Sequence, residues 1–356
     1  MTLAPELLPI LSGYGFSRHC TVVPLEGGLI NQTLMVEEAG RRTVLQRLNP
    51  LFQPEVHLDI EPITAHLERK GLRTPRLIPT TTGALWTTDE SDQVWRMLSW
   101  LDGRTLHAVE RPETARAAGA FVAQFHVAVS DLEHSFHFTR PGAHDTRAHL
   151  GALSRALGEC REHANYEAVA PVAERILDHA NTLEPLPPVP TRIVHGDLKI
   201  ANLMFNPDAS CAVALLDLDT MAALTIPIEL GDALRSWCNP GGEEAGAARL
   251  EPELLAAALG GYAEHGRELL TEAEIGSLVL GLQTIALELS ARFCADALRE
   301  RYFGWNATKF ASRSEHNLTR AVSQLAVAES VLAQRASLEA LVRENFLTPT
   351  PTAEPS

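Results

Sequence analysis

The most constraining feature of this 356-residue chain is a short polar stretch set between two apolar runs. The polar stretch begins at His195, contains Asp197 and ends at Asn202. The apolar run that follows it leads directly into Asp217 and Asp219. Burying an unpaired carboxylate is expensive, so an aspartate at the end of a buried strand needs a compensating partner. Carboxylate and amide oxygens are the ligands that Mg²⁺ prefers. Each residue alone is more typical of a turn or a cap, but the joint pattern predicts a cation-binding loop.

The spacing of these residues is typical of phosphoryl transfer. Asp197 and Asn202 keep the H-x-D-x-x-x-x-N spacing of a kinase catalytic loop, in which the aspartate is the base and the asparagine binds metal. Asp217 follows the next strand, where a second metal-binding aspartate is expected. We interpret His195 as a scaffold residue that hydrogen-bonds the loop. The sequence contains no G-x-x-x-x-G-K-[ST] segment, which excludes a P-loop as the phosphate cradle.

The first hundred residues read as strands and turns around one helix. Two β-rich runs flank the pair Gly27 and Gly28, and residues 41–49 are expected to form a third strand. Residues 58–72 are expected to form a helix with Pro62 in its first turn, where proline is tolerated, and with Gly71 as its stop signal. A further strand follows, so this part is predicted to be a small α+β lobe.

The pattern becomes helical after about residue 105. The chain is longer than one core usually sustains, which predicts two lobes. We expect a nucleotide-binding lobe over 1–103, a mainly helical catalytic and acceptor-binding lobe over 104–346, and a disordered tail over 347–356. Long helices are expected near 251–264, 271–303 and 315–345.

Composition narrows the partners and the compartment. Thirty Lys and Arg against 45 Asp and Glu give a net charge of −15, which argues against nucleic acid and anionic membrane surfaces. The apolar run 275–287 is too short to span a bilayer and is read as a buried helix. Five scattered cysteines without a CxxC pair, and an N-terminus that is a poor signal peptide, predict a reducing cytoplasm.

Together these residues resemble the aminoglycoside phosphotransferase and choline kinase superfamily, the small-molecule branch of the protein-kinase-like fold. The resemblance implies a bilobal α+β fold, with an antiparallel sheet in the small lobe, and an enzyme that uses ATP and Mg²⁺. It also implies that Asp197 is the catalytic base and that Asn202 and Asp217 are metal ligands.

The first lobe offers candidates for nucleotide binding. Gly27 and Gly28 either bring backbone N–H groups to the phosphates or form a simple hairpin turn. Gln46 or Arg47 stands where a kinase lysine contacts phosphate, and Glu61 stands where the ion-pair partner of that cation is expected. The resemblance places the adenine against the backbone that follows the hinge, at Ser99, Trp100 and Leu101.

A narrower resemblance is to the N-acetylhexosamine 1-kinase group, and it implies a sugar acceptor phosphorylated at its anomeric hydroxyl. The substrate-side candidates are His144, Asp145, Asp219 and Arg292, and the candidates for structural support, besides His195, are Asp232 and Arg235. The short segments that carry this resemblance are 44–49, 144–146, 231–235, 287–288, 292–293, 302–303 and 317–321 with Gln324.

One charged stripe has two readings. Glu288, Arg292 and Asp296 recur every fourth residue, so they lie on one helix face. They either contribute to the acceptor site or form intrahelical salt bridges on a solvated face worth about 0.3–0.5 kcal/mol each.

These patterns predict a kinase that acts on a small polar metabolite, most simply a sugar or amino sugar. An aminoglycoside- or choline-type kinase is the alternative within the same fold, with Glu243 and Glu244 as acids for a cationic acceptor. A catalytically idle scaffold is disfavoured, because Asp197, Asn202 and Asp217 are all present. The sequence assigns neither the oligomeric state nor a preference for ATP over GTP.

Overall fold

The computed structural model describes residues 5–25, 31–244 and 248–347, which form two compact units. Unit 1 contains the chain up to Gly103, together with residues 131–139 and 214–221, and unit 2 contains the remainder. The fold class predicted from the sequence, α+β with an antiparallel sheet near the N-terminus and helices after it, is confirmed. Residues 131–139 and 214–221 lie within the range 104–346, which was expected to form one continuous second lobe. Their contacts assign them to unit 1 instead.

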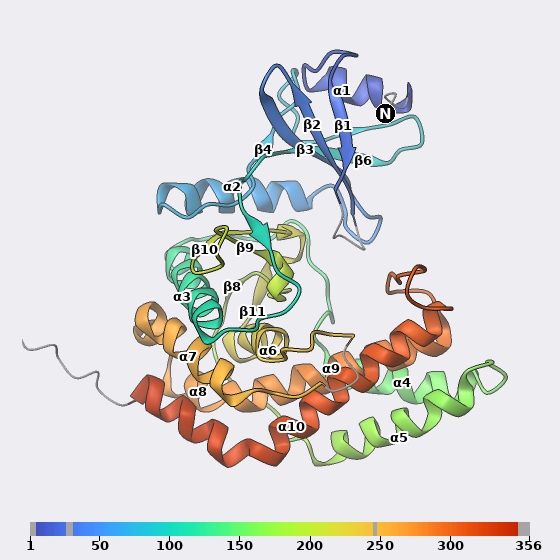
Figure 1. The fold of residues 1–356 in the computed structure, drawn as a ribbon, viewed down its shortest axis with the longest axis vertical. Coiled ribbons are helices and arrows are strands. Elements are labelled where there is room, and N and C mark those ends of the chain that lie inside the picture. The colour runs from blue at the N-terminus through green and yellow to red at the C-terminus, as the bar shows by residue number, and fades with distance from the viewer. Residues whose placement is uncertain (1–4, 26–30, 245–247, 348–356) are drawn as a thin grey trace, which may run out of the picture. The chain divides into compact units, whose positions relative to one another are not determined.

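Unit 1 is built on an antiparallel sheet with the order β1-β2-β3-β6-β4, and β5 pairs with β6 (Figure 1). Leu34 lies opposite Leu45, and Leu45 lies opposite Met97, so one sheet face presents a continuous apolar surface. These side chains form a core with Leu11 of the short helix α1. The elements are α1 (Leu8–Gly13), β1 (Thr21–Pro24), β2 (Gln32–Glu38), β3 (Arg41–Arg47), β4 (Leu77–Ile78), β5 (Thr87–Thr88) and β6 (Val94–Ser99).

Helix α2 (Val56–Arg69) corrects the expected position of its proline. The helix begins at Val56 and not near Leu58, so Pro62 lies inside it and not in its first turn. Proline has no N–H to donate to the carbonyl of Leu58, which leaves a gap in the backbone ladder. The expected stop signal is present, because Gly71 follows the helix with φ +81°.

Unit 2 is mainly helical, and α9 is its central helix, in contact with α4, α5, α6 and α10. The helix expected over 271–303 is divided at Ser277 into α8 and α9 and ends at Arg299. Leu347, expected in the tail, is helical, and residues 348–356 lie outside the described chain. The helices are α3 (Pro112–Val129), α4 (Thr146–Glu159), α5 (Tyr166–Thr182), α6 (Ile226–Trp237), α7 (Pro252–Gly266), α8 (Glu272–Gly276), α9 (Leu278–Arg299) and α10 (Arg313–Leu347).

Short strands carry the polar loops of unit 2. β8 (Thr191–Val194) pairs with β11 (Ala222–Thr225), and β7 (Arg104–Thr105) pairs with β9 (Leu203–Phe205). The chain passes from unit 2 into unit 1 within β10 (Ala212–Leu215). The polar stretch that begins at His195 follows directly after β8.

Two glycines bring α6 and α9 into close contact. A Cβ at Gly231 would lie 2.6 Å from the carbonyl oxygen of Gly281, and one at Gly281 would lie 2.1 Å from that of Pro227. Only residues without side chains permit this approach. α9 is long and apolar enough to cross a membrane, but 94% of its most apolar window is buried within the structure. It is therefore better described as a core helix, in line with the reading of residues 275–287.

Candidate functional site

The loop after β8 is fixed from both sides by α6. The indole Nε1 of Trp237 donates to the carbonyl of Leu198 at 2.8 Å, and the Ser236 hydroxyl accepts from the N–H of Ile200 at 3.0 Å. Leu198 and Ile200 are buried, which anchors the apolar side of the loop. The loop conformation is therefore determined by α6 as well as by its own sequence.

Glu229 is a loop-holding residue that the sequence analysis missed. Its buried carboxylate accepts the N–H groups of His195 at 2.8 Å and Gly196 at 2.9 Å. Burial alone would raise the pKa of Glu229, but His126 and these N–H groups outweigh burial and lower it. A carboxylate in the otherwise apolar first turn of α6 was the available signal. His195 is fully buried, and its Nδ1 accepts the N–H of Asp197 at 3.3 Å.

The Asp197 carboxylate accepts hydrogen bonds from two side chains of its own loop. Its Oδ2 accepts from Lys199 Nζ at 2.6 Å and from Asn202 Nδ2 at 3.0 Å, and the same Nδ2 reaches the carbonyl oxygen of Asp197 at 2.8 Å. Burial works to raise the pKa of Asp197, but the Lys199 ammonium outweighs it and lowers the pKa to about 2. The side chain is 23% exposed, so an ionised carboxylate is available to a ligand.

Asn202 and Asp217 have the donor atoms that a hard cation requires. The Asn202 amide nitrogen is directed at Asp197, which leaves its carbonyl oxygen at the other end of the amide. In unit 1, Asp217 follows β10 in a left-handed conformation with φ +57° and ψ +59°. Such a conformation costs a non-glycine residue roughly 1–3 kcal/mol and is found most often at functional sites. Both oxygen donors fit Mg²⁺ by their chemistry.

Asp219, expected from the sequence to contact substrate, lies in the interior of unit 1. It is 1% exposed in unit 1, where Oδ2 accepts from Arg96 Nη2 at 2.8 Å and from Asn31 Nδ2 at 2.9 Å. Arg96 Nη1 bonds the other oxygen. The charge of Arg96 outweighs burial and lowers the pKa of Asp219. Both carboxylate oxygens are engaged in the interior of unit 1, and a substrate contact of Asp219 remains a prediction.

Gln46 and Arg47, the two candidates for the residue that contacts phosphate, differ in how far their side chains are exposed to solvent. Gln46 accepts from Arg96 through Oε1 at 2.8 and 3.0 Å, so its side chain is committed to the interior of unit 1. Arg47 is exposed, with its guanidinium carbon 5.9 Å from the centre of the Trp95 ring. Of the two, only Arg47 presents its side chain to solvent.

The expected partner of Glu61 is corrected by the structure. Glu61 Oε1 accepts from Arg76 Nη2 at 2.7 Å and does not pair with Arg47. Arg76 lies just before β4, and β4 packs against α2. The cation that pairs with Glu61 therefore comes from the β4 side of α2. Glu61 therefore joins α2 to the chain that leads into β4.

The hinge candidates are partly committed within unit 1. Ser99 donates its N–H to the carbonyl of Arg76 at 2.9 Å, so this N–H is not available to an adenine. Trp100 donates from Nε1 to Asp102 at 2.9 Å, and Leu101 is partly exposed. Gly27 and Gly28 lie outside the described residues. The nucleotide-binding roles of these residues remain predictions.

Two side chains of segment 144–146 hydrogen-bond the buried carboxylate of Glu288. His144 donates from Nδ1 to Oε1 at 3.2 Å, and the Thr146 hydroxyl donates to Oε2 at 2.6 Å. Burial alone would lower the pKa of His144, but Glu288 raises it above its ordinary value. Asp145 caps α4 by accepting the N–H of Ala148 at 2.9 Å. Asp145 is thus engaged as a helix cap and His144 as a partner of Glu288.

The charged stripe on α9 is not a solvated face. Glu288 and Asp296 are 1% and 5% exposed, and Asp296 accepts the N–H groups of residues 301–303 and the amide of Asn317. Arg292 lies with its guanidinium carbon 5.7 Å from the centre of the Tyr302 ring. The stripe therefore fixes the segment that follows α9, while part of Arg292 stays exposed.

Asp232 and Arg235 form a buried pair on α6. Asp232 Oδ1 accepts from Arg235 Nε at 3.0 Å and from Nη2 at 2.7 Å, and Arg235 also pairs with Glu243. Glu244 accepts from His316 Nε2 at 3.0 Å. The two loop acids considered for a cationic acceptor are thus both engaged with side chains of unit 2.

A cavity of about 710 Å³ opens within unit 2. Its lining includes the Glu288 partners His144 and Thr146, Thr225 at the end of β11, and Thr284 of α9. The lining is mostly apolar with several hydroxyl groups, which is typical of a small-molecule site.

The fold and the family can now be stated. The structure has the protein-kinase-like fold of small-molecule phosphotransferases. It matches the aminoglycoside phosphotransferase of Alicyclobacillus acidocaldarius (TM-score 0.64, 16% identity, covering 97% of this chain and 98% of that one). It also matches the choline kinase of Cryptosporidium parvum (0.62, 12%, 96% and 99%) and an amicoumacin kinase solved with AMP-PNP and Ca²⁺ (0.60, 13%, 90% and 92%).

Residues 21–266 match the model of the phosphotransferase enzyme family, so the chain belongs to that family and is a small-molecule kinase.

Proposed function

We propose that the protein transfers the γ-phosphoryl group of ATP to a hydroxyl of a small polar metabolite, with a sugar such as an N-acetylhexosamine, at its anomeric hydroxyl, as the preferred acceptor class. The observation that carries this proposal is Asp197, an accessible carboxylate whose pKa is lowered to about 2 by Lys199 and which Asn202 fixes in place. Family membership supplies the reaction class.

Asp197 orients the acceptor hydroxyl and takes its proton as the new O–P bond forms. A carboxylate with a pKa of about 2 is a weak base, so its main contribution is orientation, and proton transfer comes late. The transferred phosphoryl group passes through a loose transition state, in which positioning and charge stabilisation matter most. Lys199, whose ammonium lies 2.6 Å from Asp197, is the proposed cation for that charge.

Mg²⁺ fits the oxygen donors of this chain. When bound, the ion neutralises charge on the nucleotide phosphates. In the proposal the oxygen donors for the ion are the Asn202 amide and the Asp217 carboxylate, as the sequence predicts. The nucleotide is proposed to be ATP because the similar amicoumacin kinase was solved with an ATP analogue. In unit 1, exposed Arg47 is the proposed phosphate contact.

The acceptor assignment draws on the resemblance to N-acetylhexosamine 1-kinases. His144 and Arg292 are the proposed acceptor contacts. Glu243 pairs with Arg235 and Glu244 with Lys309, which argues against an acidic pocket for an aminoglycoside or choline. All five cysteines are unpaired, which is consistent with a cytoplasmic enzyme.

The test is a parallel assay of ATP consumption with N-acetylhexosamines, neutral hexoses, aminoglycosides and amino alcohols, with Mg²⁺ present and then chelated. We expect Mg²⁺-dependent turnover with an N-acetylhexosamine, and a product phosphorylated at the anomeric oxygen. Turnover with only cationic acceptors would overturn the acceptor class. A folded protein with no turnover on the whole panel would overturn the kinase proposal.

A further inference from the structure

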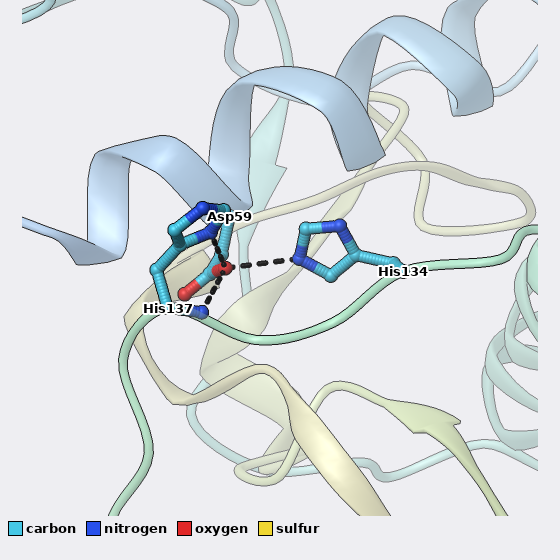
Figure 2. A group of neighbouring side chains, drawn as sticks. All are labelled: Asp59, His134 and His137. Atoms are coloured by element: carbon cyan, nitrogen blue, oxygen red, sulfur yellow. Dashed lines mark hydrogen bonds and ion pairs between the residues drawn. The ribbon is translucent and has the colours of Figure 1, made fainter.

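A second polar cluster lies within unit 1, separate from every residue given a catalytic or nucleotide-binding role above. Asp59 stands in the first turn of α2 and is 2% exposed. His134 and His137 come from residues 131–139, the segment that returns to unit 1 after α3. Figure 2 shows both imidazole rings directed at the Asp59 carboxylate.

The three side chains meet at one oxygen. Oδ1 of Asp59 lies 2.9 Å from His134 Nε2 and 3.1 Å from His137 Nδ1. One ligand atom from each residue lies within 4.8 Å of the others. As hydrogen bonds, these contacts require each histidine to carry its proton on the nitrogen that faces Asp59.

The same oxygen also receives a backbone hydrogen bond. The N–H of His137 donates to Oδ1 at 2.8 Å, so three donors converge on one oxygen. A carboxylate oxygen has two lone pairs, so a third donor does not find one of its own. A cation that took the place of the two imidazole protons would use the nitrogen lone pairs as ligands and relieve this crowding.

The donor set and the spacing fit a zinc-class ion. Two imidazole nitrogens and one carboxylate oxygen, with a fourth position for water, are a common arrangement for Zn²⁺. Metal–ligand bonds of about 2.0–2.1 Å place tetrahedral ligands roughly 3.3 Å apart. The two contacts to Oδ1 are shorter than this by only a few tenths of an ångström, so small rotations of the rings suffice.

The surroundings orient the ligands and leave a route for the ion. The other carboxylate oxygen of Asp59 accepts the N–H of Phe138 at 2.9 Å, an outer contact of the kind that fixes ligating carboxylates. The His134 ring meets Phe136 edge-on at 5.0 Å. The Asp59 and His134 side chains are 3% and 8% exposed, whereas His137 is 52% exposed and opens one side to solvent.

We propose that Asp59, His134 and His137 form a binding site for one Zn²⁺-class ion, which clamps residues 131–139 onto α2. The ion is distinct from the Mg²⁺ of phosphoryl transfer, because imidazole ligands select transition metals over Mg²⁺. The proposal does not depend on the proposed kinase function.

The test is calorimetric titration of the metal-stripped full-length protein with Zn²⁺, with millimolar Mg²⁺ present throughout. We expect one equivalent to bind tightly, and at least tenfold weaker binding for His137→Ala and for His134→Ala. His66→Ala is the matched control, since His66 also contacts a carboxylate of this unit, that of Asp131 at 3.0 Å, but belongs to no three-residue group of metal ligands among the residues that the structure describes. Its Zn²⁺ affinity is expected to equal that of the wild type.

Two further measurements keep the proposal falsifiable if a variant folds poorly. Co²⁺ in place of Zn²⁺ is expected to give visible absorption of a four-coordinate ion in the wild type and to lose it in His137→Ala, which replaces a half-exposed side chain. Zn²⁺ is expected to raise the melting temperature of the wild type and not that of the folded double variant His134→Ala/His137→Ala. Unchanged Zn²⁺ affinity in that double variant, or no stoichiometric binding by the wild type, would overturn the proposal.

Discussion

Asp219 in unit 1 and Asp197 in unit 2 have the same kinds of partner but different consequences. Each carboxylate pairs with one cationic side chain and accepts from one asparagine amide, and each has a lowered pKa. The partners are Arg96 and Asn31 for Asp219, and Lys199 and Asn202 for Asp197.

The difference lies in exposure and in the type of cation. Asp219 is 1% exposed, and the planar Arg96 guanidinium engages both of its oxygens. Asp197 keeps 23% of its side chain exposed and is paired with an ammonium on a flexible stem. Lysine is a point charge that can change partner, whereas arginine holds a fixed two-point geometry. The comparison teaches that Asp219 holds a fold in place and that Asp197 is available for chemistry.

The largest expected effect separates the two aspartates by activity. Asp197→Asn removes the charge that orients the acceptor hydroxyl, so kcat is expected to fall about 10²- to 10⁴-fold with the fold retained. Steady-state kinase assays with the accepted sugar, together with circular dichroism melts, measure both quantities.

Asp178→Asn, on an exposed position of α5, is the matched control and is expected to keep wild-type activity. If Asp197→Asn retained more than a tenth of the wild-type kcat, Asp197 would not be the residue that orients the hydroxyl.

The second prediction addresses Asp219 through stability. Asp219→Asn leaves the Arg96 cation buried without its counter-charge, so the free energy of unfolding is expected to fall by about 3–5 kcal/mol. Urea denaturation monitored by tryptophan fluorescence measures this loss. The double variant Asp219→Asn/Arg96→Met is expected to be more stable than the sum of the two single variants implies, because no unpaired charge remains. A loss below about 1 kcal/mol in the single variant would refute the assignment of Asp219 as a buried anchor.

The third prediction tests why the pKa of Asp197 is low. Lys199→Met removes the positive charge that lowers the pKa of Asp197. Burial is then expected to raise this pKa from about 2 toward or above its ordinary 3.8. The acid limb of the pH–rate profile is expected to move upward by about two pH units, which corresponds to roughly 2.5 kcal/mol. Lys199→Arg keeps the charge, and its acid limb is expected to stay near that of the wild type. An unchanged profile in Lys199→Met would assign the low pKa to another cause.

The smallest effect concerns a third buried carboxylate, Glu288, whose cationic partner titrates. The pKa of His144 is raised in the folded state, so this contact stabilises fully below about pH 6.5 and its contribution is lost as the pH rises through the folded-state value. His144→Gln is expected to remove that pH dependence and to cost about 1 kcal/mol at pH 6. Thermal melts between pH 6 and 9 measure it. His163→Gln, which removes a more exposed pair with Glu300, is the control; the same flattening in that control would refute the prediction.

Much of the local structure was predictable from the sequence. The β-rich runs on either side of Gly27 and Gly28, and the run 41–49, predicted strands where β2 and β3 lie, and Gly71 predicted the end of α2. Pro62 was placed wrongly, because proline in a first turn and proline inside a helix give the same local signal until the true first residue is known.

The side-chain partners were much harder to predict. The roles of Asp197 and Asn202 follow from local spacing, and the described hydrogen bonds join them over five residues. Glu61 was assigned the wrong partner, and Glu229 was missed, because their contacts are made by segments that only packing brings together.

The sequence alone determined the class of chemistry, because a histidine, two aspartates and an asparagine at fixed spacing act through one short loop and one strand end. Only the tertiary structure decided which carboxylates are available. Asp219 meets Asn31 across 188 positions of sequence, and Asp59 meets His134 across 75. Burial and charge pairing depend on such long-range contacts, which local patterns do not encode, and these contacts determine whether an acidic side chain supports the fold, binds a cation or acts on a substrate.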